Sequence, residues 1–114
     1  MNSPRYRISD EELINLVEMK SSLKKLLEDV GEVNGYSVEQ MKSKNRVYPL
    51  PYARSSFAVI AKEAYPSASS ELIGSMVNKD HSTVIAMYKR VEEVREAQAY
   101  YQNTKEKLKK YKQN

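Results

Sequence analysis

Three neighbouring side chains, those of Asp80, His81 and Ser82, are of the types that form a hydrolytic triad. Consecutive residues on a helix point about 100° apart, so these groups cannot hydrogen-bond to one another in a relay. The sequence holds one histidine and no cysteine, which leaves no plausible zinc site. Acidic pairs such as Glu92-Glu93 fall on a polar helix face, where no cleft is indicated for acid–base chemistry. We therefore expect no enzyme activity, no metal and no cofactor.

The charge of the chain instead favours a polyanionic partner. Nineteen Lys and Arg against 15 Asp and Glu leave a mild net charge of +4, but its distribution is uneven. Five cations and no acid lie between Gln40 and Lys62, namely Lys42, Lys44, Arg46, Arg54 and Lys62. A second basic run, Lys105 to Lys112, is most simply a solvated helix end, where cations suit the helix dipole.

The composition is typical of one helical domain. The 114 residues include three Gly and one Phe, with abundant Leu, Glu, Lys and Ala, which favours helices over a sandwich or barrel. The first residues lack the apolar run of a signal peptide, and nothing approaches the ~18 apolar residues of a membrane span. We therefore expect an all-α protein in the cytoplasm with no membrane partner.

The first predicted helix is long. Ser9 has the position of an N-cap, with Glu12 three residues later as in a capping box, and Gly35 is a natural stop after Asn34. Its apolar residues recur at alternating steps of three and four, which predicts one buried stripe. The stripe comprises Leu16, Met19, Leu23, Leu26, Val30 and Val33.

Four shorter elements and a loop follow. The helices are predicted over Val38–Lys42, Tyr52–Tyr65, a short stretch from Ser69 or Ser70 through Val77, and from Asp80 past Arg95. Residues 44–51 form a loop, because Pro49 and Pro51 each bar the preceding residue from helical geometry. Asn78-Lys79 is a tight turn between the last two helices.

A short helix, a turn and a longer helix form the layout of a DNA-reading helix-turn-helix. The major groove admits one α-helix, whose first turns meet the base edges. The groups offered there are Lys79, Asp80, His81, Ser82 and Thr83, and farther along the outer face lie Ile85, Ala86, Lys89 and Arg90. From the layout alone, Asp80 is equally well a plain N-cap, and a helical interaction module without DNA specificity stays open.

The segment Lys79-Asp80-His81-Ser82-Thr83-Val84-Ile85 resembles the signature of the C-terminal DNA-binding domain of the bacterial replication initiator DnaA. In that family a basic residue precedes Asp-His, Ser or Thr, Thr and Val at the start of the recognition helix. Further matches at suitable offsets are Ile73-Gly74, Ala61-Lys62-Glu63, the stretch from Val38 to Lys44, and Arg46. The resemblance runs from about residue 23 to residue 94.

The resemblance implies a Trp-repressor-like helix-turn-helix bundle, here with long first and last helices, that binds the DnaA box or a relative of it in double-stranded DNA. Asp80, His81 and Ser82 would read bases in the major groove. Arg46 would enter the neighbouring minor groove, where negative potential is concentrated, and Arg54 would contact phosphate. With the rest of the basic loop and helix face, the expected DNA-binding residues are Lys44, Arg46, Arg54, Lys79, Asp80, His81, Ser82, Thr83 and Lys89.

The chain also departs from the family. The family often has two glycines in the turn before the basic residue. Here the whole turn is one residue shorter and reads Val77-Asn78, and Asn78 tolerates a left-handed conformation. No G-x-x-x-x-G-K-[ST] loop is present, so the initiator's ATPase is missing. The start at Met1 and the extended helices favour a stand-alone binder over an excised domain. Its expected role is replication initiation or its regulation, with a transcription regulator of a mobile element as the alternative.

The expected organisation has three parts: a flexible stretch over residues 1–8, the DNA-binding domain over 9–98 and a polar helical extension over 99–114. The long first and last helices carry thin apolar stripes beyond the family core. Leu13, Leu16 and Met19 are expected to pack on Tyr101, Leu108 and Tyr111. Packing within one chain is the simpler case, and a homodimer or a protein partner through these helices stays open.

Overall fold

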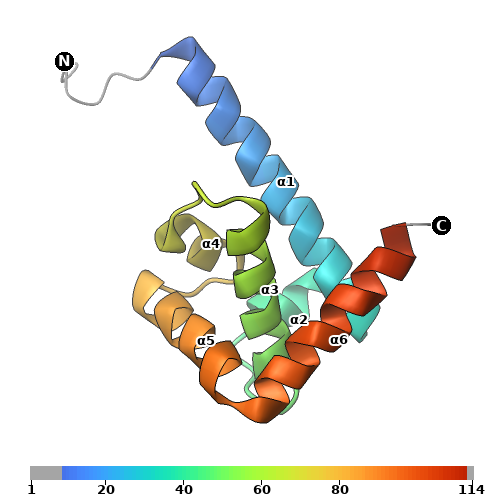
Figure 1. Cartoon of the computed structure of the whole chain (residues 1–114). Coiled ribbons are helices and arrows are strands. Elements are labelled where there is room, and N and C mark those ends of the chain that lie inside the picture. Colours follow the sequence, from blue (N-terminus) through green and yellow to red (C-terminus); the bar gives the residue numbers. More distant parts are fainter. Residues whose placement is uncertain (1–8, 113–114) are drawn as a thin grey trace.

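The computed structural model describes residues 9–112, which form six helices and no strand (Figure 1). The helices are α1 (Asp10–Asn34), α2 (Val38–Lys42), α3 (Leu50–Ala64), α4 (Ser70–Met76), α5 (His81–Glu93) and α6 (Arg95–Lys112). α3 packs against α1, α5 and α6, so one core forms around it. The predicted all-α helix-turn-helix class is confirmed, whereas the flexible stretch expected over residues 1–8 lies outside the described residues.

α1 begins and ends where the sequence predicted, because local hydrogen bonds close both of its ends. The Oγ of Ser9 accepts the N–H of Glu12 at 3.1 Å, and the carboxylate of Glu12 accepts the N–H of Ser9 at 3.1 Å. At the other end Gly35 takes a left-handed φ of 82°, and its N–H donates to the carbonyl of Glu32. The capping box and the glycine stop are therefore both confirmed.

The buried face of α1 is wider around the helix than the predicted stripe, but it extends over fewer of the turns of the helix. Leu23 and Val30 are fully buried as expected, but Leu27 joins them because α1 also packs against α2 and α4. The first turns of α1 project beyond the body of the molecule, and Leu13 and Leu16 are exposed there (Figure 1). Within one chain, the expected packing of these two residues on the last helix is therefore wrong.

α3 supplies the centre of the core. It begins at Leu50 rather than at the predicted Tyr52, since a proline such as Pro51 is tolerated in the first helical turn, where its missing N–H has no partner. Phe57 is fully buried at the middle of the helix. Ala64, in the last turn of the helix, is exposed.

A break at Val94 divides the single last helix that the sequence predicted. Val94 has an extended ψ of 117°, so α5 ends there and α6 turns back across α1 and α3 (Figure 1). Tyr101, Thr104 and Leu108 of α6 are buried, and the hydroxyl of Thr104 accepts a hydrogen bond from the side chain of Asn34 at 3.2 Å. α6 therefore packs on the core beyond residue 98, where the sequence placed a polar extension. No helix within residues 9–112 is long and apolar enough to cross a bilayer.

The packing of α6 makes the stability of the fold sensitive to alkaline pH. Burial raises the pKa of Tyr100 to about 12, and the nearby Tyr36 and Tyr48 add to the shift. Tyrosines of the unfolded chain ionise near pH ~10, so the folded chain holds this proton more tightly. We expect a contribution to stability that is complete below about pH 10 and is lost as the pH rises toward about 12.

Alkaline unfolding followed by circular dichroism, together with titration of tyrosinate absorbance, measures this loss. Tyr100→Phe should reduce the fall in stability, because the variant has no proton to lose at that position. Tyr111→Phe, which alters an exposed tyrosine of the same helix, should leave the fall unchanged. An unchanged pH dependence in Tyr100→Phe would mean that its ionisation does not drive the transition.

Candidate nucleic-acid interface

The turn between α4 and α5 is held by hydrogen bonds to one carbonyl. Gly74 O accepts the N–H of Val77 at 3.0 Å and the N–H of Lys79 at 2.9 Å. Between them Asn78 takes a left-handed φ of 57°, as predicted, and its side-chain amide donates to the carbonyl of Lys42 at 3.3 Å. The turn is thereby attached both to α4 and to the end of α2, and it sets the direction in which α5 leaves.

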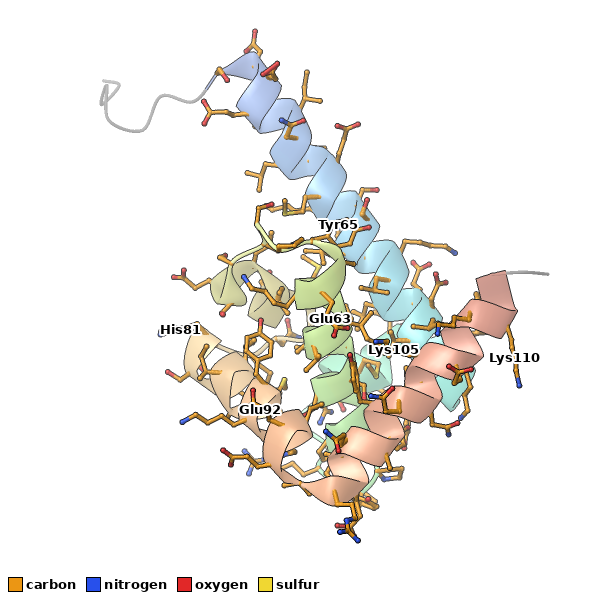
Figure 2. All side chains as sticks on the ribbon, in the orientation of Figure 1. Glu63, Tyr65, His81, Glu92, Lys105 and Lys110 are labelled. Carbon is orange, nitrogen blue, oxygen red and sulfur yellow. The ribbon has the colours of Figure 1, made fainter. Side chains whose placement is uncertain are left out.

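α5 starts at an N-cap. The Oδ1 of Asp80 accepts the N–H of Thr83 at 2.9 Å, and this hydrogen bond lowers the pKa of the Asp80 carboxyl. The capping role that the sequence left open is therefore present. The first turn of the helix is otherwise free of the core, since His81 and Ser82 are exposed, and His81 lies at the tip of the helix (Figure 2).

The two faces of α5 differ in kind. Val84, Met87 and Val91 are buried against α3 and α4, which secures the helix along its length. The opposite face is solvent-exposed and carries small, apolar and basic groups beyond the first turn, namely Ile85, Ala86 and Lys89. A helix held in this way presents a rigid outer face of the size that a major groove accepts.

Beside this face lies a pocket with a positively charged lining, here called the basic pocket. It has a volume of about 280 Å³ and is lined by Arg46, Pro51, Arg54, Lys79, Thr83, Met87 and Arg90. The pKa of the Lys79 ammonium is lowered, first by partial burial and then by the positive charges of Arg54, Arg46 and Lys44. Cations gathered this closely repel one another, and an anion placed among them would relieve that repulsion.

Arg54 differs from the expectation that it is a surface phosphate contact. It is 2 % exposed, and its guanidinium closes the end of α2: Nε donates to Met41 O at 2.8 Å. Nη2 donates to Ser43 O at 2.8 Å and to Gln40 O at 3.1 Å. These bonds use most of the donors that a phosphate would need, so its main observed role is to hold the start of the basic loop in place.

The loop between α2 and α3 carries the other predicted cations. Lys44 and Arg46 are exposed, and Arg46 also lines the basic pocket. The side chain of Asn45 shapes the loop locally by accepting the N–H of Val47 at 2.9 Å. The loop therefore presents Arg46 next to α5, where the sequence reasoning expected a contact with the neighbouring groove.

Arg90 was named on the outer face of the helix but was not among the residues expected to bind DNA. It lies half-buried in the basic pocket, and its Nη1 donates to Ser55 Oγ at 3.2 Å. The position of Arg90 in the pocket could have been predicted from the helical spacing of Thr83, Met87 and Arg90, which puts all three on one stripe of α5. Lys89, which was expected to bind DNA, is exposed and does not line the pocket.

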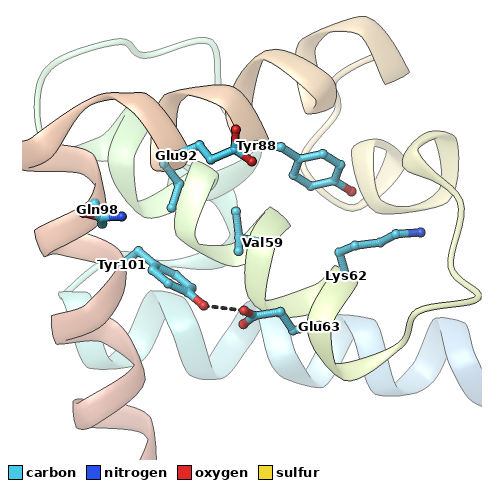
Figure 3. A pocket seen from close by; sticks show the side chains of 8 residues that line it. Val59, Lys62, Glu63, Tyr88, Glu92, Gln98 and Tyr101 are labelled. Carbon is cyan, nitrogen blue, oxygen red and sulfur yellow. Dashed lines mark hydrogen bonds between the residues drawn. The ribbon is translucent and has the colours of Figure 1, made fainter.

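A second and larger pocket lies between α3, α5 and α6 (Figure 3). It has a volume of about 510 Å³, and its wall is mainly apolar. Two carboxylates, those of Glu63 and Glu92, lie in its lining, and the hydroxyl of Tyr101 donates to Glu63 at 2.5 Å (Figure 3). Negative charge at this place disfavours a phosphate, so the face formed by α5 and the basic loop is the stronger candidate for a nucleic-acid interface.

The helices of this candidate interface match a known protein family. Residues 23–91, which are more than half of the chain, match the family described as the bacterial DnaA protein helix-turn-helix. The match covers the short helix α2, the basic loop, the turn and all but the last residues of α5. Neither the curated proteins nor the solved structures gave a match. The chain therefore belongs to the bacterial DnaA helix-turn-helix family, whose domain binds double-stranded DNA.

Proposed function

We propose that this protein binds a specific double-stranded site, the DnaA box or a relative of it, and that it acts in replication initiation or its regulation. The observation that carries the proposal is the exposed first turn of α5 beside the basic pocket. Base recognition needs a helix tip free of the core, and anchoring needs cations within reach of the phosphates beside the groove.

The residues divide into readers and anchors. His81 and Ser82 offer donors and acceptors at the tip of α5, with Asp80 beside them as cap, and these groups read bases in the major groove. Lys79 and Arg90 face phosphate from the basic pocket. Arg46 reaches the adjacent minor groove from its exposed loop position, where a narrow groove favours a guanidinium.

The outer cations add affinity without sequence preference. Lys44 and Lys89 are exposed on either side of the reading face, and each contacts phosphate as the duplex settles on α5. Thr83 lies at the wall of the basic pocket, where its hydroxyl is available to a phosphate oxygen. Arg54 acts mainly through the loop that it holds.

Fluorescence anisotropy with a duplex carrying a DnaA box and a scrambled duplex of equal length tests the proposal. We expect tighter binding to the box, and a salt dependence that corresponds to roughly 5–8 phosphate contacts. Equal and weak binding to both duplexes would defeat the specific function and favour a helical interaction module.

His81→Ala separates reading from anchoring. The variant should lose roughly 1–3 kcal/mol of binding free energy on the box and almost none on the scrambled duplex. Lys89→Ala, which removes an exposed cation of the same helix, should weaken binding to both duplexes alike and lower the salt dependence by about one contact. The same loss on both duplexes for His81→Ala would show that this residue anchors rather than reads.

A further inference from the structure

The projecting half of α1 carries an apolar patch that nothing in the described chain covers. Leu13 is 47 % exposed, Ile14 and Val17 are each 58 % exposed, and Leu16 is 38 % exposed. These residues lie within two turns of one helix, in the part of α1 that extends beyond the body of the molecule (Figure 1). Single exposed apolar residues are ordinary, whereas a contiguous group of this kind marks an interaction site.

Most of the patch lies on a different face from the one that α1 packs into the core. At about 100° per residue, Leu13, Ile14 and Val17 share one side of the helix, and the fully buried Leu23 lies about 120° away from Val17. Leu16 lies only about 20° from Leu23 and continues the core face. The apolar stripe formed by Leu13, Ile14 and Val17 is therefore centred away from the core face.

Two opposite charges flank the patch on the same side of α1. Asp10 lies one turn beyond Leu13 and Ile14 toward the N-terminus, and Lys20 lies one turn beyond Val17 toward the C-terminus. Neither forms an ion pair within residues 9–112, whereas Lys25 farther along the helix is engaged by Asp29 at 3.4 Å. The stripe is thus negative at one end, apolar in the middle and positive at the other end.

We propose that α1 pairs antiparallel with α1 of a second copy of this chain. A two-fold axis beside position 15 sets Leu13 opposite Val17 of the second copy and, by symmetry, Val17 opposite its Leu13. The same register sets Asp10 opposite Lys20 of the second copy at both ends of the pair. A parallel pairing would instead place Asp10 against Asp10 and Lys20 against Lys20, so charge selects the antiparallel arrangement.

The pairing gives the protein two reading helices on one particle. It does not depend on which DNA site is read, because the patch is remote from α5 and the basic loop (Figure 1). A symmetric pair of this kind would favour two inverted half-sites over one.

Sedimentation equilibrium of the full chain over a range of concentrations tests the pairing without DNA. We expect a reversible monomer–dimer equilibrium, and Val17→Asp should abolish the dimer by placing a charge in the apolar stripe. Asn15→Asp adds the same charge to the same segment on the opposite, exposed side of the helix and should leave the dimer intact. A constant monomer mass for the unaltered chain would overturn the proposal.

Charge reversal tests the register. Asp10→Lys and Lys20→Asp should each weaken dimerisation about tenfold, since each turns two attractive pairs into repulsive ones. The double variant carrying both changes should recover the original dimer, and circular dichroism of each variant checks that α1 remains helical. Failure of the double variant to recover, with helicity intact, would exclude this register.

Cross-linking tests the same register covalently, because the chain has no cysteine of its own. In an equimolar mixture, Leu13→Cys and Val17→Cys chains should form a mixed disulfide-linked dimer under mild oxidation. Either variant alone should cross-link more slowly, since its two thiols lie about one helical turn apart along the helices, roughly 6 Å. Equal rates for the mixture and the separate variants would contradict the antiparallel arrangement.

Discussion

Replacing Arg54 by methionine is expected to destabilise the folded protein by roughly 3–5 kcal/mol. The substitution keeps much of the apolar stem but removes a guanidinium that donates to Gln40, Met41 and Ser43 carbonyls near the end of α2. The carbonyls of Met41 and Ser43 lose the hydrogen bonds that Arg54 donates, and the basic loop that follows loses its attachment. Urea unfolding monitored by far-UV circular dichroism measures the loss.

Arg46→Met is the matched control. It removes the same charge from the same region, but Arg46 is exposed on the loop, so stability should change by less than about 0.5 kcal/mol. Because Arg54 lies close enough to Arg46 for its own pKa to be lowered by that charge, the control even relieves a repulsion. DNA affinity should fall in Arg46→Met while the fold is intact.

Arg54→Lys tests whether charge or shape matters at this position. Lysine keeps the charge but lacks the planar fork that meets several carbonyls at once, so we expect a stability between those of the unaltered protein and Arg54→Met. If Arg54→Met were as stable as the unaltered protein yet bound both duplexes weakly, Arg54 would be a phosphate contact after all. The structural role assigned to it would then be wrong.

The burial of Arg54 shows where the sequence stops being informative. The family resemblance implied that Arg54 contacts phosphate, and nothing within a few residues indicates that its side chain is buried. Its partners lie 11 to 14 positions away, on the other side of the loop. Only the folding of α2 onto α3 brings Arg54 and these carbonyls together, and local periodicity does not predict that contact.

Local chemistry, by contrast, was sufficient for the four helix starts that have a side-chain cap. Ser9, Ser37, Ser69 and Asp80 each cap a helix through a hydrogen bond to the N–H of a residue three positions later. Such a bond needs only the right side chain beside the right helix start. The reading helix could therefore be placed from sequence, and with it the exposed residues of the candidate interface.

Tertiary packing decided the features that the sequence did not predict. No Gly or Pro near Val94 predicts the helix break there. The break follows from the packing of α6 across α1 and α3. Leu27 was left out of the stripe because Leu26 fitted the spacing. Leu26 lines one pocket with Leu108 of α6, whereas Leu27 lines another with Val38 of α2 and Met76 of α4, so α1 is packed on two sides at once.

Gly74→Ala should destabilise the protein by about 1–3 kcal/mol, opposite in sign to what helix propensity alone implies. Alanine in place of glycine within a helix is ordinarily favourable by up to about 1 kcal/mol. At Gly74, however, an added Cβ would lie 2.4 Å from the carbonyl oxygen of Lys79 and 3.0 Å from a methyl group of Val84. Both belong to the segment that directs the reading helix, and a backbone carbonyl cannot move away as a flexible side chain can.

The same clash should also affect the selectivity of DNA binding. To accept the methyl group, Lys79 and the start of α5 must shift, which moves His81 relative to the basic pocket. We therefore expect Gly74→Ala to lower the ratio of box to scrambled binding, measured at a temperature where the variant remains folded. Ser75→Ala, one position later and exposed, should leave both stability and the ratio nearly unchanged. A Gly74→Ala variant as stable and as selective as the unaltered protein would mean that the turn has room for a side chain. The close approach of α4 to the turn would then not be what aims the reading helix.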